Sequence, residues 1–412
     1  MRACAAALSM SKTFSLDAAS VVGAIADAAR RWRDADFPAR VRVTAAIAAR
    51  TGYTVPVVDY ALDCLFAPLD AGTIEAAIVQ ELGSLEILDR FAPRAGALAR
   101  AYPIGKVVIV SSETTIGVAL VPAVYALCAK CSVLVKDRED TLIAAFFATL
   151  REELPELASL ADARSWKSGA LDGDMELRLA DAVVAFGRDD SLTAIRAILR
   201  PGARFVGYGH RASVGYVSRA TLAGEESAKA AAQGAARDLV LYDGEGCMSL
   251  HALFVERGGA VAPEEFARLL IDAAAAASIE FPAGRLDPRV VTYCTGAAFR
   301  AALGRGSVLR TPAGDVTLVV DPPVHDTPPL LPRILPILSI DAPEECEEYV
   351  RSHGLPIEAF ALSDQHAALL ELGARIGAVR ITQLGAMQAP GPGLHHGGRA
   401  RIADFIRWID VA

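Results

Sequence analysis

A cysteine preceded by two glycines is the residue of this chain best suited to chemistry. Cys247 follows Gly244-Glu245-Gly246, and the alternating run from Met248 to Val255 behind it predicts a β-strand. Glycines at this spacing allow positive φ angles and close backbone approach. Backbone N–H groups that face a sulfur lower the thiol pKa, and the thiolate is the nucleophilic form. Spacing alone leaves two readings open, a nucleophile and a buried cysteine packed as a small apolar side chain.

His251 is the second candidate, because it lies four residues beyond Cys247. In a strand this parity directs both side chains to one face, but about 13 Å apart at the usual rise per residue. His251 could therefore donate a proton only if the chain bends. A packed or hydrogen-bonded histidine is the alternative.

Three other motifs carry weaker signals. Cys128-Ala-Lys-Cys131 has redox or half-site metal spacing, but no second cysteine pair accompanies it, so we predict structural packing and no metal site. The segment 207–212 imitates a dinucleotide fingerprint but is followed by a poor helix start, which leaves a Rossmann-type reductase as a weak competitor. His395 and His396 stand in a Gly/Pro-rich loop, where a solvated or substrate-gating role is more common than metal binding.

Composition excludes several classes of protein. The chain has 412 residues, enough for two domains, and a net charge of -8 that argues against a nucleic-acid partner. Its seven cysteines are an odd, scattered set, which is not a secreted disulfide framework, and no apolar run is long enough to span a bilayer. We expect a cytoplasmic protein. The sequence contains no asparagine, so no Asn side chain can form an oxyanion hole.

The elements around these residues predict parallel α/β architecture. After a helical layer over 16–100, a buried strand over 103–110 ends in the polar Ser111-Ser-Glu-Thr-Thr115. The later elements of this half are a helix (116–129), a strand (132–135), a helix (141–150), a strand (182–186), a helix (191–199) and a strand (204–207). Such sheets bind ligands at the carboxyl ends of their strands. Asp190 and Ser191 are plausible N-caps of a helix whose N-terminus suits a phosphate.

Beyond the cysteine segment the pattern continues. The expected helices are 263–277, 297–303, 343–353, 364–374 and 402–409, and the expected strands are 290–294, 316–320, 337–340 and 378–381. The proline-rich segment 321–336 predicts an extended connection.

Three segments of the chain resemble the aldehyde dehydrogenase superfamily, and within it the fatty acyl-CoA reductases of the bacterial bioluminescence (LuxC) type. They are 103–136, 184–187 and Tyr242-Asp-Gly-Glu-Gly-Cys-Met-Ser-Leu-His251. The tail from Arg380 to 410 is similar to the ending of that family. The resemblance implies that Lys136 and Glu139 bind the adenosine ribose and that Gly187, with Ser191 behind it, lies near the pyrophosphate. It also implies that Cys247 is the nucleophile.

This sequence departs from the superfamily's pattern in three places. The oxyanion-hole asparagine falls at Glu113, and the candidate substitutes are the backbone N–H of Cys247 and the hydroxyl of Thr114 or Thr115. We group Glu113 and Thr114 with the cofactor-binding residues. The general-base glutamate has no equivalent in 205–210. The segment that holds the nicotinamide ribose is replaced by Leu331-Pro-Arg-Ile-Leu-Pro336.

The missing base favours reduction of a thioester, because only a hydrolysing enzyme must activate water. We therefore predict an aldehyde-dehydrogenase-like protein of two doubly wound α/β domains with the active site in the cleft between them. Residues 1–238 form the cofactor domain, 239–385 the catalytic domain and 386–412 a return segment. The expected activity is NAD(P)H-dependent reduction of an acyl-CoA to the aldehyde, with NADPH the first choice.

Two other functions stay open: a non-redox acyl carrier or inactive scaffold, and an NAD(P)-dependent aldehyde dehydrogenase. Besides the acyl thioester, the partners we expect are further copies of the chain in a homo-oligomer and a protein that transfers the acyl group.

Overall fold

The computed structural model describes residues 16–112, 115–137, 141–285, 287–304, 306–322, 330–391 and 395–412. The chain divides into two compact units. Unit 1 contains the described residues of 1–50, 58–209 and 391–412, and unit 2 contains those of 51–57 and 210–390. None of the helices within the described residues is long and apolar enough to cross a membrane.

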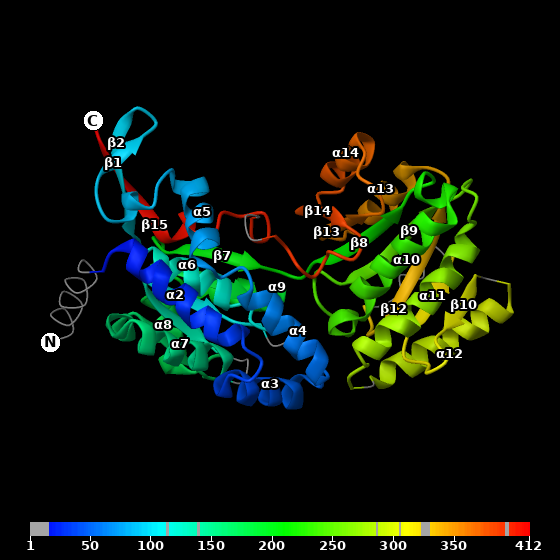
Figure 1. The fold of residues 1–412 in the computed structure, drawn as a ribbon, viewed down its shortest axis with the longest axis horizontal. Coiled ribbons are helices and arrows are strands. Elements are labelled where there is room, and N and C mark those ends of the chain that lie inside the picture. The colour runs from blue at the N-terminus through cyan, green and yellow to red at the C-terminus, as the bar shows by residue number, and fades with distance from the viewer. Residues whose placement is uncertain are drawn as a thin grey trace. The chain divides into compact units, whose positions relative to one another are not determined.

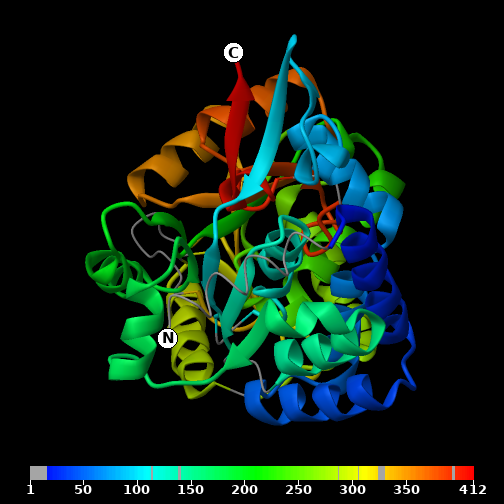
Figure 2. The same ribbon diagram turned by 90° about the vertical axis from the view of Figure 1, so that its left-hand side faces the viewer.

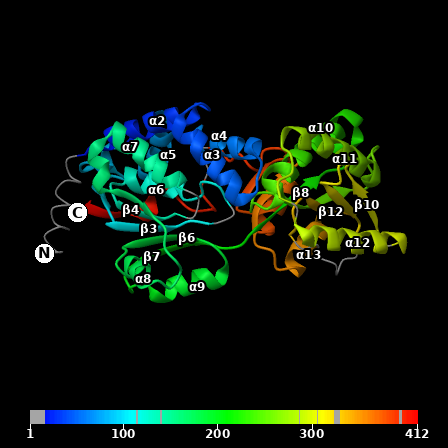
Figure 3. The ribbon, with the colours of Figure 1, turned by 90° about the horizontal axis from the view of Figure 1, so that it is seen from below.

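Unit 1 is built on a parallel five-stranded sheet of order β5-β4-β3-β6-β7. Its strands are β3 (Lys106–Val110), β4 (Ser132–Lys136), β5 (Ala161–Arg164), β6 (Ala182–Phe186) and β7 (Arg204–Tyr208). The helices α6 (Leu120–Cys128) and α7 (Leu142–Glu153) cover one face, and α8 (Leu171–Arg178) and α9 (Asp189–Ile198) cover the other (Figure 3). Because both faces are covered, the central strands read as continuous apolar runs.

The predicted helical layer packs onto α7. It consists of α2 (Ala18–Arg33), α3 (Pro38–Thr51), α4 (Val55–Phe66) and α5 (Ala71–Leu82). Trp32 is fully buried, stacks on Phe66 with ring centroids 5.0 Å apart, and donates its indole N–H to Thr149 Oγ1. This aromatic contact joins the layer to the sheet domain.

A separate three-stranded sheet of order β1-β2-β15 corrects two predictions. The helical layer expected over 16–100 stops short of residue 100, because the strands β1 (Ala92–Arg94) and β2 (Ala97–Pro103) form its end. The segment 402–409 is not a helix but the short 3-10 turn η5 (Ala403–Phe405) followed by β15 (Ile406–Val411). β15 runs antiparallel to β2 (Ala97–Pro103), and the two strands lie side by side in Figure 2. Arg204 donates to the carbonyls of Ala403, Asp404 and Ile406, so long-range pairing overrides the helical periodicity of the segment.

Unit 2 contains a seven-stranded sheet of order β10-β11-β12-β9-β8-β13-β14, parallel except for β10 (Figure 1). Its parallel strands are β8 (Ala212–Val217), β9 (Leu250–Glu256), β11 (Thr317–Val320), β12 (Ile334–Ile340), β13 (Ile357–Leu362) and β14 (Arg380–Gln383), and β10 spans Ser307–Arg310. The helices α10 (Glu225–Val240) and α11 (Pro263–Glu280) cover one face. The other face carries α12 (Pro288–Ala302), α13 (Pro343–Ser352) and α14 (Ala367–Arg375) (Figure 3).

Unit 2 differs from the sequence prediction in two ways. The division between units falls after Gly209, earlier than the expected boundary at 238, because β8 and α10 already belong to the seven-stranded sheet. The predicted strand 290–294 is part of α12, where Cys294 and Ala297 face a buried cluster at helical spacing. The β-branched run Val290-Val-Thr favoured a strand, but packing on the sheet selects the helix.

Candidate active site

The loop before Cys247 has an unusual backbone. Tyr242, Asp243 and Gly244 all lie in the left-handed region, with φ of 53°, 52° and 72°. Non-glycine residues rarely adopt this conformation, which costs free energy unless the surroundings hold it. The sequence predicted a glycine bend here, but the strain begins two residues before the first glycine.

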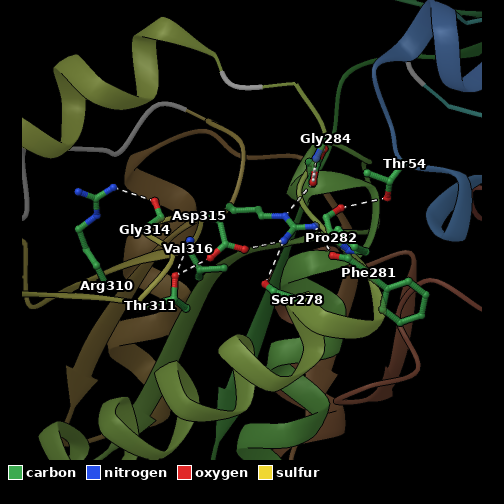
Figure 4. Close-up of polar contacts among 12 residues, drawn as sticks. Thr54, Ser278, Phe281, Pro282, Gly284, Arg310, Thr311, Gly314, Asp315 and Val316 are labelled. Atoms are coloured by element: carbon green, nitrogen blue, oxygen red, sulfur yellow. Dashed lines mark hydrogen bonds and ion pairs between the residues drawn. The ribbon is translucent and has the colours of Figure 1, made fainter.

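A buried arginine holds this strained loop. Arg333 is 2% exposed, its Nε donates to Asp243 Oδ1 at 2.7 Å, and its backbone N–H donates to Asp243 O at 2.9 Å. The same guanidinium reaches Ser278 Oγ at 3.0 Å, Asp315 Oδ2 at 3.2 Å and Phe281 O at 2.7 Å (Figure 4). One cation therefore ties the loop to α11 and to the segment before β11.

The carboxylate of Asp243 extends the network. Its Oδ2 accepts from the backbone N–H of Gly284 at 3.1 Å, and Thr54 Oγ1 donates to Pro282 O at 3.0 Å close by (Figure 4). Burial raises the pKa of Asp243, and Arg333 opposes that shift. Its hydrogen bonds and the cation of Arg333 offset part of the cost of burying this carboxylate.

Cys247 itself lies at the start of β9, at the amino ends of the parallel strands. The chain turns between Gly246 and Ser249, where Ser249 N–H donates to Gly246 O at 2.8 Å, so the thiol is set outside the strand. Ser213 Oγ donates to Cys247 O at 2.6 Å and accepts from the backbone N–H of Ala359 at 3.0 Å. A single hydroxyl thus ties the loop of Cys247 to β8 and β13.

The thiol is less acidic than the sequence suggested. Burial, and after it the carboxylate of Glu358, raise the pKa of Cys247 to about 11, while Arg380, the residue's own backbone N–H and Arg211 act in the opposite direction. The expected facing N–H is present, but desolvation outweighs it. A proton acceptor is therefore needed before this thiol can attack at neutral pH.

Three charged side chains lie in this region. Glu358 belongs to β13 and forms an ion pair of 3.5 Å with Arg211, which directly precedes β8. Arg380, the first residue of β14, donates to Met248 Sδ at 3.5 Å and to Met387 O. The sequence analysis missed all three; the available signal was a charged residue inside the otherwise apolar strand 357–362.

The segment after β14 supports the loop from another side. Asp238 accepts from the backbone N–H groups of Gly385 and Met387 at 2.6 and 3.1 Å, and burial raises its pKa to about 7. Gln388 Nε2 donates to Ser249 Oγ at 2.8 Å, and the same hydroxyl accepts from Gly246 N–H at 3.1 Å. Residues 385–388 therefore fix the turn that carries Cys247.

His251 has the environment of a packed histidine. Its Nδ1 accepts from the backbone N–H of Ser213 at 3.0 Å, and it also has a backbone hydrogen bond with Gly244. Burial, and then the neighbouring His210, lower its pKa to about 4, so the ring is neutral at physiological pH. This geometry favours the hydrogen-bonded alternative over a proton donor.

In unit 1, Lys136 occupies the position expected of a ligand-binding lysine. It is the last residue of β4, it is 4% exposed, and its Nζ contacts Ser168 Oγ at 3.2 Å and lies 5.4 Å from the ring centroid of Trp166. Glu113, Thr114 and Glu139, which we grouped with it, lie outside the described residues. Of these four residues, Lys136 is the one that the described part of the chain includes, and it lies at the carboxyl end of β4.

Gly187 and Ser191 flank the start of α9. Gly187 directly follows β6 and donates its N–H to Tyr208 O at 3.2 Å. The helix begins at Asp189 with Arg188 as N-cap, so Asp190 and Ser191 are not caps but lie in the first turn. Its N–H groups suit a phosphate, while the two carboxylates of the first turn oppose one.

The remaining motifs have structural surroundings. Cys128 and Cys131 are buried, burial raises the pKa of each thiol to about 12, and Cys131 Sγ lies 3.2 Å from Phe405 O, which fits the packing interpretation. The ring of His396 stacks on Tyr208 at 4.9 Å between centroids. Residues 204–208 are strand β7, so the fingerprint-like segment has no helix behind it.

Comparison with known proteins decides the family. A model of the acyl-CoA reductase (LuxC) family matches residues 14–408. The chain belongs to this family. Membership places it among oxidoreductases that act on aldehydes or acyl groups and confirms the predicted resemblance. No curated protein matches the sequence in a direct search.

Solved aldehyde dehydrogenases share the fold of this LuxC family member. An NAD-dependent benzaldehyde dehydrogenase from Corynebacterium glutamicum has a TM-score of 0.71 at 14% identity, covering 97% of this chain and 86% of its own. An aldehyde dehydrogenase from Brucella melitensis biovar abortus 2308 has a TM-score of 0.71 at 14% identity, with 99% and 87% covered. These matches confirm the predicted aldehyde-dehydrogenase-like α/β fold.

Proposed function

We propose that this protein reduces an acyl-CoA to the corresponding aldehyde through an acyl group carried on Cys247, with a nicotinamide cofactor as reductant and NADPH before NADH. The observation that carries the proposal is the position of Cys247. In a chain of the acyl-CoA reductase family, a partly buried thiol stands outside a strand on a loop that a buried arginine, Ser213 and Gln388 hold from three sides. Such preorganisation suits a nucleophile.

The proposed reaction takes place at this loop in three steps. Cys247 Sγ attacks the thioester carbonyl, and CoA leaves as a thiolate without needing an acid. A nicotinamide held by unit 1 would supply the hydride that reduces the acyl carbon. Cys247 Sγ then leaves the resulting thiohemiacetal, which releases the aldehyde and restores the free cysteine. The backbone N–H of Cys247 is the donor we assign to the developing oxyanion.

The cofactor residues are proposed in unit 1. Lys136 fits a ribose hydroxyl, because it ends a parallel strand and places its ammonium beside Ser168 and Trp166. The first-turn N–H groups of α9, after Gly187 and with Arg188 beside them, fit a pyrophosphate, although Asp189 and Asp190 weaken that site. Four of the dehydrogenases with this fold are described as NAD-dependent or in complex with NAD+ or NAP, which supports a nicotinamide.

The decisive experiment is intact-protein mass spectrometry after mixing with acyl-CoA. Without reductant the protein should gain one acyl mass that maps to Cys247, and reduced nicotinamide should remove it as aldehyde appears. An acyl mass that persists with reductant supports the carrier function instead. Rapid loss of the acyl group as free acid, without reductant, supports an aldehyde dehydrogenase, for which the nearby Glu358 would supply the water-activating carboxylate.

A further inference from the structure

The proposed reaction leaves one carboxylate beside Cys247 without a role. Glu358 lies on β13 between the buried residues Ile357 and Ala359, and its side chain is 15% exposed. A charged group in a largely buried strand is costly to desolvate unless its surroundings compensate for it. An apolar side chain at this position would leave the backbone hydrogen bonds of the sheet unchanged.

Backbone geometry brings Glu358 to the nucleophile loop. Ser213 Oγ is hydrogen-bonded both to Cys247 O, at 2.6 Å, and to the N–H of Ala359, at 3.0 Å, the residue next to Glu358. The ion pair of Glu358 with Arg211 lies at the same amino ends of β8 and β13. Among the charged groups, Glu358 has the largest effect on the Cys247 thiol, and it acts through its charge rather than through a hydrogen bond.

The charged groups around Glu358 come from three segments. Arg211 before β8 and Arg380 on β14 both favour its ionised form, whereas burial raises its pKa. Asp238 at the end of α10 shares Arg380 with it. Glu358 is therefore a carboxylate of raised basicity that two guanidinium groups still keep available as a proton acceptor.

We propose that Glu358 is the general base that removes the proton of Cys247 when the thiol attacks the acyl thioester. This deepens the proposed function and rests on it. The Sγ–H proton passes through one water molecule to the Glu358 carboxylate while Sγ bonds to the acyl carbon. The bond between that carbon and the CoA sulfur breaks, and Glu358 returns the proton to the CoA thiolate. One thioester replaces another, with no change of oxidation state.

Such a base explains how a thiol of high pKa reacts near neutrality. With a pKa of about 11, only about one thiol in 10⁴ is ionised at pH 7. A general base contributes on the order of 10²- to 10⁴-fold to a proton transfer. With Glu358 ionised as the base, the acylation rate should be nearly independent of pH from the pKa of Glu358 up to that of the thiol.

The test compares Glu358→Gln with wild type in quenched-flow acylation by acyl-CoA without reductant, followed by intact mass between pH 6 and 10. At pH 7 the variant should acylate on the order of 10²-fold more slowly. Its rate should then rise about tenfold per pH unit and approach wild type as the thiol ionises on its own. Glu371→Gln, which changes an exposed carboxylate on α14, is the matched control and should behave as wild type.

Iodoacetamide alkylation of Cys247 separates a base from a packing residue. Removing the negative charge of Glu358 lowers the thiol pKa, so alkylation of Glu358→Gln at pH 7 should not fall. Equal losses of acylation and alkylation at every pH would show a packing role and overturn the proposal. If the variant acylates at the wild-type rate or faster, Glu358 is not the base and its charge only raises the pKa of the thiol, which also overturns the proposal. Absence of any acylation in wild type would overturn this inference together with the proposed function.

Discussion

The two large sheets of this protein carry their candidate site residues at opposite ends of their strands. In unit 1, Lys136 and Gly187 stand at the carboxyl ends of β4 and β6, where open α/β sheets usually bind ligands. In unit 2, Cys247 stands at the amino end of β9, and Glu358 and Arg380 stand at the starts of β13 and β14 in the same sheet. The strand-end rule therefore predicts the proposed cofactor residues but not the nucleophile.

The difference also shows in what holds each site. Lys136 ends a regular strand and contacts Ser168 and Trp166. Cys247 depends on a loop of three consecutive left-handed residues, and the ion pair between Arg333 and Asp243 holds that loop. A site outside the usual strand edge requires its own polar framework, because regular backbone geometry does not supply the position.

Removing the nucleophile gives the largest expected effect. Cys247→Ala should form no acyl-enzyme and no aldehyde, because a covalent intermediate cannot form without its nucleophile. Nicotinamide affinity should stay at the wild-type value, since its proposed contacts lie in unit 1. Fluorescence titration with the cofactor checks the unchanged affinity, and measurement of the acyl mass checks the loss of the acyl-enzyme. Acylation that instead maps to Cys294 would disprove the assignment of the nucleophile.

Breaking the framework of the loop should cost stability as well as acylation. Arg333→Met leaves the Asp243 and Asp315 carboxylates buried without their cation, which typically costs about 3–5 kcal/mol. Chemical denaturation measures that loss. Arg310→Met is the control, because Arg310 is exposed and contacts only Gly314 O in Figure 4. Equal stabilities of the two variants would contradict the role we give to the network.

Lys136→Ala should show the reverse pattern of Cys247→Ala. Loss of one charge-assisted hydrogen bond of about 1.5–3 kcal/mol should weaken nicotinamide binding by about 10- to 100-fold. Acylation without reductant should continue at the wild-type rate. If a titration shows that the variant binds the cofactor with unchanged affinity, Lys136 is not part of the cofactor site. The contrast between the two sheets would then no longer hold for unit 1.

The smallest effect is expected at the other cysteine pair. Cys128→Ala with Cys131→Ala should leave acylation and nicotinamide binding unchanged and lower stability by roughly 1 kcal/mol, as modest core truncations do. Elemental analysis provides the second measurement. Zinc at one equivalent in wild type, lost in the double variant, would contradict the packing interpretation.

Sequence reasoning succeeded where local pattern and tertiary context agree. The strand at 182–186 and the helix at 343–352 were predicted within a residue or two, because their apolar periodicity matches the surface they bury. The segments 290–294 and 402–409 were assigned wrongly, because α12 packs on a sheet and β15 pairs with β2, about 300 residues away in sequence. Contacts at such separation leave no trace in a short window.

The site shows the same limit. Cys247 has a local signal in its glycines, but Arg333 was noticed only as the absence of a family motif. The partners of Arg333 belong to segments that are far apart in sequence, so only the fold brings them into contact with it. Glu358 offered the one readable hint, a charge inside an apolar strand.

The pairing of β15 with β2 has a consequence for synthesis on the ribosome. Unit 1 acquires its five-stranded sheet by Tyr208, but β2 waits for a partner that begins at Ile406, about 200 residues later. At 5–20 residues per second the interval is roughly 10–40 s. During that time β2 presents an unpaired edge, and such edges recruit other strands. Nascent chains are therefore most exposed to misassembly while unit 2 is being translated, and chaperone capture in that window should favour the β2 segment.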